Sequence, residues 1–120
     1  MKSLFAKDTD FHYISGLEKY ELQDFKGAIE DYNRAIEINQ NHPWAYNNRG
    51  EAKQKLNDFT GAIADFDISI KNYPTHGGVY ICRGYARYKL GDNFGACSDW
   101  NKAGVLGEKD ALYLIKYFIQ

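Results

Sequence analysis

The sequence predicts an all-α protein, an α-solenoid of stacked antiparallel helix pairs. One pattern of glycine, alanine, aspartate and aromatic residues recurs every 34 residues, the length of a helix–turn–helix unit. Turn residues at Asn57–Asp58 and Gly91–Asp92 divide the units into two segments of helical length. No segment alternates polar and apolar residues with the period of two that a half-buried strand requires.

The repeat rests on seven positions that keep the same residue or residue type in all three units. They are Gly16, Gly50 and Gly84; Leu22, Leu56 and Leu90; Asp24, Asp58 and Asp92; Gly27, Gly61 and Gly95; Ala28, Ala62 and Ala96; Asp31, Asp65 and Asp99; and the aromatic set Tyr32, Phe66 and Trp100. Glycine and alanine allow two helices to approach closely, and the aromatic ring fills the space beside that contact. Because one helix pair cannot bury its apolar face alone, we expect the units to stack into a single domain.

Seven helices are expected in chain order, six of them in three repeats of about 9–42, 43–76 and 77–110 within one domain at 1–120. The expected helices are 10–22, 26–38, 43–56, 60–72, 78–90, 94–105 and a capping helix at about 109–119. Asn41 is expected to cap the third helix, with Pro43 in its first turn. Pro74 ends the second unit.

These positions resemble the tetratricopeptide repeat family. The residues that carry the resemblance are Tyr46, Gly50, Ala62, Phe66 and Pro74 in the second unit, Tyr80, Gly84, Ala96 and Trp100 in the third, and Gly16, Ala28 and Tyr32 in the first. The resemblance covers roughly residues 9–110, and the segments NRG, AIADF and ACSDW are similar to bacterial members. It departs from the family at Arg49 and Arg83, which replace the usual leucine. The resemblance implies a right-handed superhelix of helix pairs.

The resemblance also implies a binding surface, because the first helix of each unit lines a concave groove in this family. The positions carried over are Tyr13, Leu17, Tyr20 and Glu21; Trp44, Asn47, Asn48, Glu51 and Lys55; and Ile81, Cys82, Tyr85, Tyr88 and Lys89. Aromatic residues such as Trp44 and Tyr85 are typical anchors of binding energy. The alternative is that these aromatic side chains are half-buried packing residues.

Some members of the family hold a carboxylate-ended peptide with Lys, Asn and Arg side chains at fixed groove positions. Only Asn48 matches that set in this chain. The other positions are occupied by Tyr13, Leu17, Gly78 and Cys82. A groove for an apolar or mixed segment is therefore expected in place of a carboxylate clamp.

Composition argues against other function classes. Lys and Arg number 15 against 16 Asp and Glu, so the chain lacks the basic stripe of a nucleic-acid or membrane-surface binder. An RNA-binding repeat is the weakest alternative, since Glu21 and Glu51 offset Lys55 and Lys89. No apolar run reaches the ~20 residues of a membrane span, and Met1–Phe5 begins no signal-peptide core, so a cytoplasmic location is expected.

No catalytic or metal-binding pattern is present in the sequence. Cys82 and Cys97 are expected to be free thiols, and His12, His42 and His76 form no ligand set. We therefore expect no cofactor and no enzyme activity. The predicted function is a protein–protein interaction module that binds a segment of a partner protein in the groove. The alternative is a self-assembling subunit, a homodimer or larger oligomer.

The alternative rests on the capping helix. Between Ala111 and Ile119 only Lys116 is polar. One apolar stripe should cover Trp100, and the other, with Tyr113 or Tyr117, should contact a second copy or fold toward the groove. Otherwise this stripe simply stays partly exposed.

A further prediction concerns the two arginines on the flank that faces the preceding unit. The first unit has Ser15 in place of arginine and Glu18 in place of the alanine at Ala52 and Ala86. We expect this difference because nothing precedes that unit, which places Met1 near the beginning of the array. The expected ion pairs cross the junctions, Asp31 with Arg49 and Asp65 with Arg83, leaving Asp99 for Lys109, Lys116 or a backbone donor of the last helix. The alternatives are arginines that extend to solvent unpaired, or a pair between Arg49 and Asp65 within one unit.

Overall fold

The computed structural model describes the backbone of residues 2–119 and the side chains of residues 10–119, so Met1 lies outside the described residues. Within these bounds the chain forms seven helices and no strand. The helices are α1 (Lys2–Glu21), α2 (Phe25–Ile38), α3 (Ala45–Lys55), α4 (Phe59–Asn72), α5 (Gly77–Lys89), α6 (Asn93–Val105) and α7 (Ala111–Phe118). Six of the expected helices are confirmed to within two residues at each end. The first is longer than expected, because it begins at Lys2.

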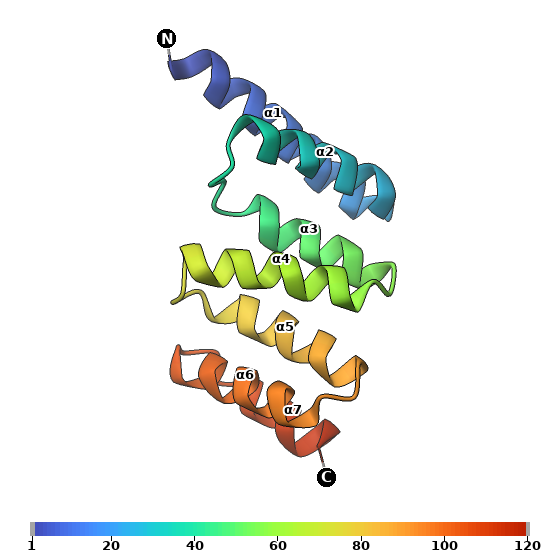
Figure 1. Ribbon diagram of the computed structural model, residues 1–120, viewed down its shortest axis with the longest axis vertical. Helices are drawn as coiled ribbons and strands as arrows, with labels where there is room; N and C mark the ends of the chain where they lie inside the picture. Colours follow the sequence, from blue (N-terminus) through green and yellow to red (C-terminus); the bar gives the residue numbers. More distant parts are fainter. Residues whose placement is uncertain (1, 120) are drawn as a thin grey trace.

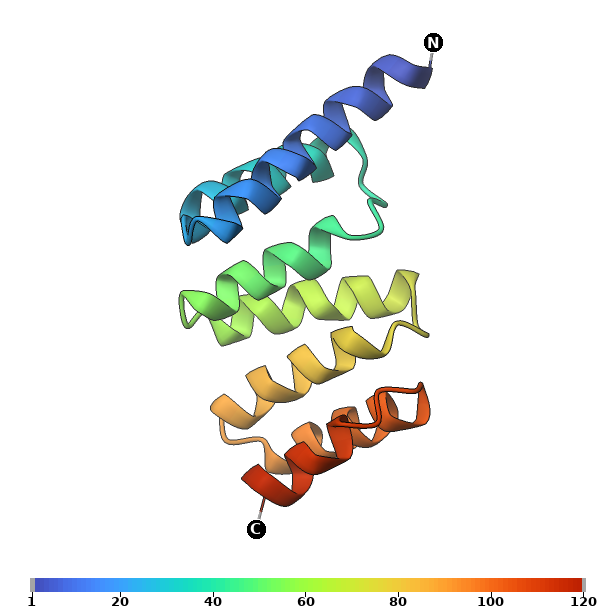
Figure 2. The same ribbon diagram turned by 180° about the vertical axis from the view of Figure 1, so that it is seen from behind.

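The helices stack along one axis in two layers. Helices α2, α4 and α6 lie toward the viewer in Figure 1, and α1, α3, α5 and α7 lie toward the viewer in Figure 2. Each helix packs against the next in the chain, and α3 also contacts α1 and α5 directly. The result is an elongated array of 52 × 26 × 20 Å in which α1, α3 and α5 form one wall.

Within each unit, the recurring glycine of the first helix faces the recurring aromatic ring of the second. A Cβ atom on Gly16, Gly50 or Gly84 would lie 2.5, 2.6 and 2.5 Å from the rings of Tyr32, Phe66 and Trp100, closer than van der Waals contact allows. The three aromatic side chains and the alanines four residues before them are completely buried. The predicted close approach of the two helices is therefore confirmed.

The turn between the two helices of a unit has the same capping geometry in all three units. Asp24, Asp58 and Asp92 cap the second helices by accepting hydrogen bonds from the backbone N–H groups of Gly27, Gly61 and Gly95 at 3.0, 2.9 and 2.8 Å. The residue before each aspartate has a positive φ, at Gln23 (64°), Asn57 (64°) and Gly91 (87°). A left-handed residue after a helix returns the chain so that its last carbonyls are satisfied.

The predicted cap of α3 is wrong. Pro43 lies before the helix, which begins at Ala45, and Asn41 makes a local hydrogen bond to Asn39. The backbone N–H groups of Trp44 and Ala45 instead donate to Nδ1 of His42, at 3.2 and 3.1 Å. An imidazole can reach two successive N–H groups from this distance, so the histidine takes the role expected of the asparagine.

The predicted ion pairs across the junctions are wrong as well. The guanidinium of Arg49 makes a two-pronged pair with Asp65 of its own unit, with Nε and Nη2 at 2.9 and 2.7 Å from the two carboxylate oxygens. Arg83 pairs in the same way with Asp99, at 3.0 and 2.8 Å. Lys53 and Arg87 complete the two clusters, so Asp99 is held by α5 and not by the last helix.

The arginines do reach the preceding unit, but through a different residue. Nη1 of Arg49 donates to Asn33 at 2.8 Å, and Nη1 of Arg83 donates to Asp67 at 2.8 Å. These acceptors lie two residues beyond the recurring aspartate, on the side of the second helix that faces the next unit. Asp31 bonds to Ser15 at 2.6 Å and Lys19 at 3.0 Å within the first unit.

Helix α7 closes the array at the third unit. Ala111 is buried, and Leu114, Ile115 and Phe118 pack on the cluster around Trp100, as expected. Tyr113 and Tyr117 are 70% and 77% exposed on the opposite side. Neither ring folds toward the wall formed by α1, α3 and α5, so that part of the prediction is wrong.

Candidate functional site

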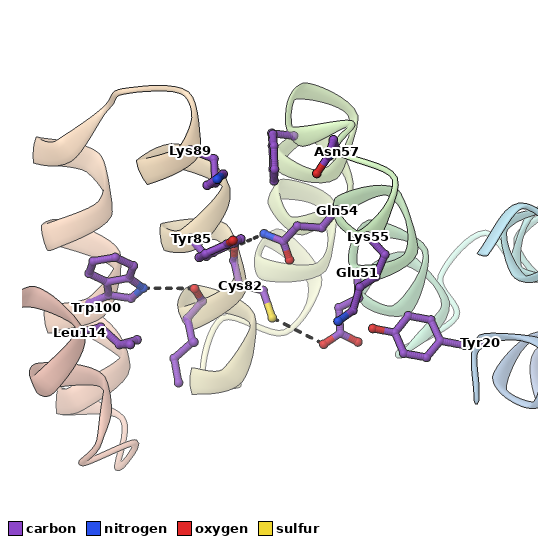
Figure 3. A pocket seen from close by; sticks show the side chains of 12 residues that line it. Tyr20, Glu51, Gln54, Lys55, Asn57, Cys82, Tyr85, Lys89, Trp100 and Leu114 are labelled. Atoms are coloured by element: carbon purple, nitrogen blue, oxygen red, sulfur yellow. Dashed lines mark hydrogen bonds between the residues drawn. The ribbon is translucent and has the colours of Figure 1, made fainter. Parts of the chain in front are cut away.

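A groove lies along the wall formed by the first helices, centred between α3 and α5 (Figure 3). Its volume is about 510 Å³, within the range of sites that hold small ligands or side chains. We call this hollow the inner groove. It is lined by Tyr20, Glu51, Gln54, Lys55, Asn57, Phe59, Ile81, Cys82, Tyr85, Lys89, Trp100 and Leu114.

Half of the binding residues predicted from the sequence line the inner groove. These are Tyr20 from α1, Glu51 and Lys55 from α3, and Ile81, Tyr85 and Lys89 from α5. Cys82 lies among them. Side chains one or two helical turns apart share a face, and this spacing brings them to one wall.

The other predicted positions lie outside the inner groove. The ring centroid of Tyr13 is 4.7 Å from His42, and Leu17 packs against the cluster of Ala28 and Tyr32. Tyr88 packs against the rings of Trp100 and Phe118, which also contact each other.

The predicted binding residues at the start of α3 also contact other side chains of the chain itself. Trp44 stacks on Tyr73, with ring centroids 6.5 Å apart, and meets His76 edge-on. Asn47 is buried, and Asn48 lies beside the hydroxyl of Tyr13. A role for these residues in binding stays a prediction.

Sequence reasoning missed five lining residues. Gln54 shares the helical face of Glu51 and Lys55, as periodicity predicts, but the predicted groove set left it out. Asn57 lies in the turn after α3 and Phe59 is the first residue of α4, so the periodicity of α3 does not extend to them. Trp100 and Leu114 reach the groove from α6 and α7, which only the packing of the last unit reveals.

A polar cluster spans the floor of the inner groove between α3 and α5. The thiol of Cys82 donates to Oε1 of Glu51 at 3.5 Å, and Nε2 of Gln54 donates to the backbone carbonyl of Cys82 at 2.9 Å. Burial raises the pKa of the Glu51 carboxyl, although Cys82, Lys55 and His76 act against it. Burial, together with the charge of Glu51, also raises the pKa of the Cys82 thiol well above its usual range. Cys82 is therefore a neutral hydrogen-bond donor and a poor nucleophile.

The rim of the groove is aromatic and basic. Tyr85 is 38% exposed and its ring meets Phe59 edge-on, with centroids 6.3 Å apart. Lys55 and Lys89 are both exposed at the edge. The groove thus offers an aromatic surface with one recessed carboxylate and two solvated ammonium groups.

Metal-binding groups and membrane-spanning helices are two further features that the described residues could contain. No group of three or more His, Cys, Asp or Glu side chains in residues 10–119 is placed to hold a metal ion. No described helix combines the length and the apolar character needed to cross a bilayer. Cys82 and Cys97 are both free thiols.

Comparison with known proteins identifies the repeat. Residues 16–57 match the family model described as TPR repeat. The Arabidopsis OM64 TPR domain superposes with a TM-score of 0.91 over 95% of this chain and 96% of that domain, at 24% identity. Residues 16–57 therefore match a tetratricopeptide repeat, and the chain as a whole has the fold of tetratricopeptide repeat domains. No curated protein sequence matches it significantly.

Other solved tetratricopeptide repeat (TPR) structures share the fold. The first TPR of Spaghetti (RPAP3), bound to HSP90 peptide SRMEEVD, gives a TM-score of 0.89 at 19% identity, covering 93% of this chain and 90% of that one. The TPR2B domain of yeast Sti1, in complex with an Hsp70 peptide, gives 0.85 at 21% identity, covering 93% and 94%. At this identity the likeness establishes the fold of the chain.

Proposed function

We propose that this protein is a protein–protein interaction module whose inner groove binds a segment of a partner protein. The observation that carries the proposal is the groove itself, about 510 Å³ in volume and lined by aromatic and polar side chains from α1, α3 and α5. Sites of this kind hold aromatic or aliphatic anchors while a few polar groups fix orientation. Similar TPR structures contain HSP90 or Hsp70 peptides, which supports a peptide as the class of ligand.

The partner differs from the carboxylate-ended peptide of those neighbours. Four of the five clamp positions are occupied by Tyr13, Leu17, Gly78 and Cys82, none of which carries a cation. Glu51 adds a carboxylate to the same surface. We therefore propose a partner segment other than an acidic C-terminal tail, and we propose no catalytic step.

The test is a selection of displayed random dodecapeptides on the immobilised chain, followed by binding measurements on the enriched peptides. Tyr85→Ala should weaken binding at least about tenfold, because it removes an exposed aromatic anchor. Phe94→Ala is the matched control, because Phe94 is 88% exposed on α6, outside the inner groove. This control should bind as the wild type does.

Backbone amide shifts of the labelled protein locate the bound peptide. We expect the peptide to shift signals of α3 and α5, and to leave those of α2 and α4 in place. Enriched peptides that bind Tyr85→Ala as well as wild type, or that shift the second helices, would contradict the groove assignment. Failure to enrich any peptide would contradict the proposed function.

Self-assembly is the second candidate, and the exposed side of α7 favours it. Leu112, Tyr113 and Tyr117 are 51%, 70% and 77% exposed. A hollow of about 480 Å³ lies against Tyr113, Leu114, Lys116 and Tyr117. The proposed occupant is a second copy of the chain, since a two-fold contact between identical faces is the commonest oligomer. Light scattering should then give a dimer that Tyr113→Glu dissociates, and a monomer across the micromolar range would contradict it.

A further inference from the structure

The carboxylate of Glu51 is the one acidic group in the lining of the inner groove, and its surroundings differ from those of the other carboxylates in the repeats. Asp31, Asp65 and Asp99 are buried, and each is paired with at least one Lys or Arg of its own unit. Glu51 takes part in none of the ion pairs of the described residues. Its hydrogen bond comes from the weakly donating thiol of Cys82 at 3.5 Å.

Among the described residues no Lys, Arg or His forms an ion pair with Glu51, although Lys55 and His76 are near enough to act on the pKa of its carboxyl. Lys53 and Arg49 point to the other side of α3, where both bind Asp65. Lys55 lies one turn along the groove face, but it is exposed and outside ion-pair distance. A recessed carboxylate without a charged partner is costly in the free protein, and the cost is recovered when a ligand brings the partner.

The groups around Glu51 suit a cation. Figure 3 shows the ring of Tyr20 reaching from α1 with its hydroxyl directed toward the carboxylate, while Cys82 approaches from α5. Glu51 lies close enough to Tyr13 and Tyr20 for its charge to raise the pKa of both phenols, after the larger effect of burial. A carboxylate with a phenol hydroxyl beside it favours ammonium and guanidinium groups, through charge pairing with the carboxylate and hydrogen bonds donated to both groups.

We propose that the inner groove binds a partner segment through a lysine or arginine side chain that pairs with Glu51 between α1 and α5. The inference rests on the proposed function and names the chemistry of the segment. The competing occupant is an acidic segment that pairs with Lys55 and Lys89 at the rim. The observations favour the basic side chain, because the two lysines are exposed and already solvated, whereas Glu51 is recessed, where a charge pair is screened less.

The experiment uses the dodecapeptide selection described above, with wild type, Glu51→Gln and Glu37→Gln in parallel. Glu37 is exposed on α2, so Glu37→Gln makes the same chemical change outside the groove. Wild type and Glu37→Gln should enrich peptides with a recurring Lys or Arg next to apolar residues. Glu51→Gln should lose the enrichment of the basic residue.

One enriched peptide is then synthesised with its basic residue and with glutamine in that place. Either change alone, Glu51→Gln or the peptide substitution, should raise Kd at least about tenfold. The two changes together should raise Kd little more than either one does alone, because both remove the same ion pair. If Glu51 had a purely structural role, the two losses of binding free energy would add. The peptide substitution tests the same pair on the unaltered protein, so the result does not depend on the folding of the variant.

Three results would overturn the inference while leaving the proposed function standing. These are enriched peptides without a recurring basic residue, an acidic motif, and basic enrichment that survives in Glu51→Gln. If the wild type enriches no peptide, the proposed function fails and this inference fails with it.

Discussion

At the scale of single residues, the buried aspartates of the three units show what the position requires. In each unit two polar or basic groups from the first helix reach one aspartate of the second: Ser15 and Lys19, Arg49 and Lys53, Arg83 and Arg87. Burial opposes ionisation of Asp31, yet the hydrogen bonds from Ser15 and Lys19 lower its pKa. These clusters fix how the two helices of a unit sit against each other.

The contrast between Asp65 and Asp67 tests this role on one helix. The side chain of Asp65 is 2% exposed and binds Arg49 and Lys53, whereas that of Asp67 is 53% exposed and binds Arg83. Asp65→Ala leaves two cations without a buried partner and should cost about 2–4 kcal/mol of unfolding free energy, since both cations retain some access to water. Asp67→Ala should cost about 0.2–1 kcal/mol. Urea unfolding at neutral pH measures both, and equal losses would show that burial does not govern these pairs.

At the scale of elements, side chains accept hydrogen bonds from free backbone N–H groups at the start of α2, α3, α4 and α6. The second helices share one solution, an aspartate cap after a residue with positive φ. Helix α3 has another, in which the neutral imidazole of His42 accepts two backbone hydrogen bonds. That arrangement depends on pH, because protonated histidine has no acceptor nitrogen.

The unfolding free energy should therefore fall in mild acid. Burial lowers the pKa of His42 below its ordinary value of 6.5, although Asp10 opposes the shift. Because the folded-state pKa is the lower one, the stability from the neutral ring is present above about 6.5 and is lost as the pH falls through the folded-state pKa. His42→Asn keeps an acceptor that does not titrate. Urea unfolding from pH 7.5 to 5 should show a smaller decline in this variant, and equal slopes would contradict the role of the ring.

At the scale of the whole molecule, each unit is stabilised by its neighbours along the stack. Helices contact those before and after them, and α7 supplies the last such contact to the cluster around Trp100. Stability in such arrays is a sum of local terms, so a change at one end is felt mainly at that end.

Phe118→Ala should show this local effect. The Phe118 ring lies 5.0 Å from Tyr88 and 5.9 Å from Trp100, between centroids, so its loss should cost about 2 kcal/mol, below the 3–5 of a fully buried phenylalanine. Hydrogen exchange should accelerate in α5, α6 and α7 and change little in α1 and α2. Tyr117→Ala, at a ring that is 77% exposed, is the control and should stay within about 0.5 kcal/mol of wild type. Uniform acceleration along the chain would contradict the local model.

The sequence alone determined the number of helices, their bounds except the start of α1, and the close contacts inside each unit. These features follow from local rules: a 34-residue period, aspartates at helix starts, and glycines where a ring leaves no space for a Cβ atom. The wall that forms the inner groove was implied by the resemblance to the repeat family, and helical periodicity indicated which side chains share its face. The residues that line the inner groove could not all be predicted, because periodicity does not determine how deeply neighbouring helices bury side chains such as Asn47 or Tyr88.

Only the tertiary structure decided which carboxylate each arginine binds and which residues reach the groove from other helices. From the sequence, Arg49 had Asp31 and Asp65 within comparable reach, and a long flexible side chain does not choose between them by periodicity. The choice depends on the angle between packed helices, which sets Asp65 in line with the guanidinium and presents Asn33 to its remaining N–H group. The same geometry leaves Glu51 recessed between α1 and α5 outside the ion pairs of the described residues, and no pattern in the sequence distinguishes it from a solvated glutamate.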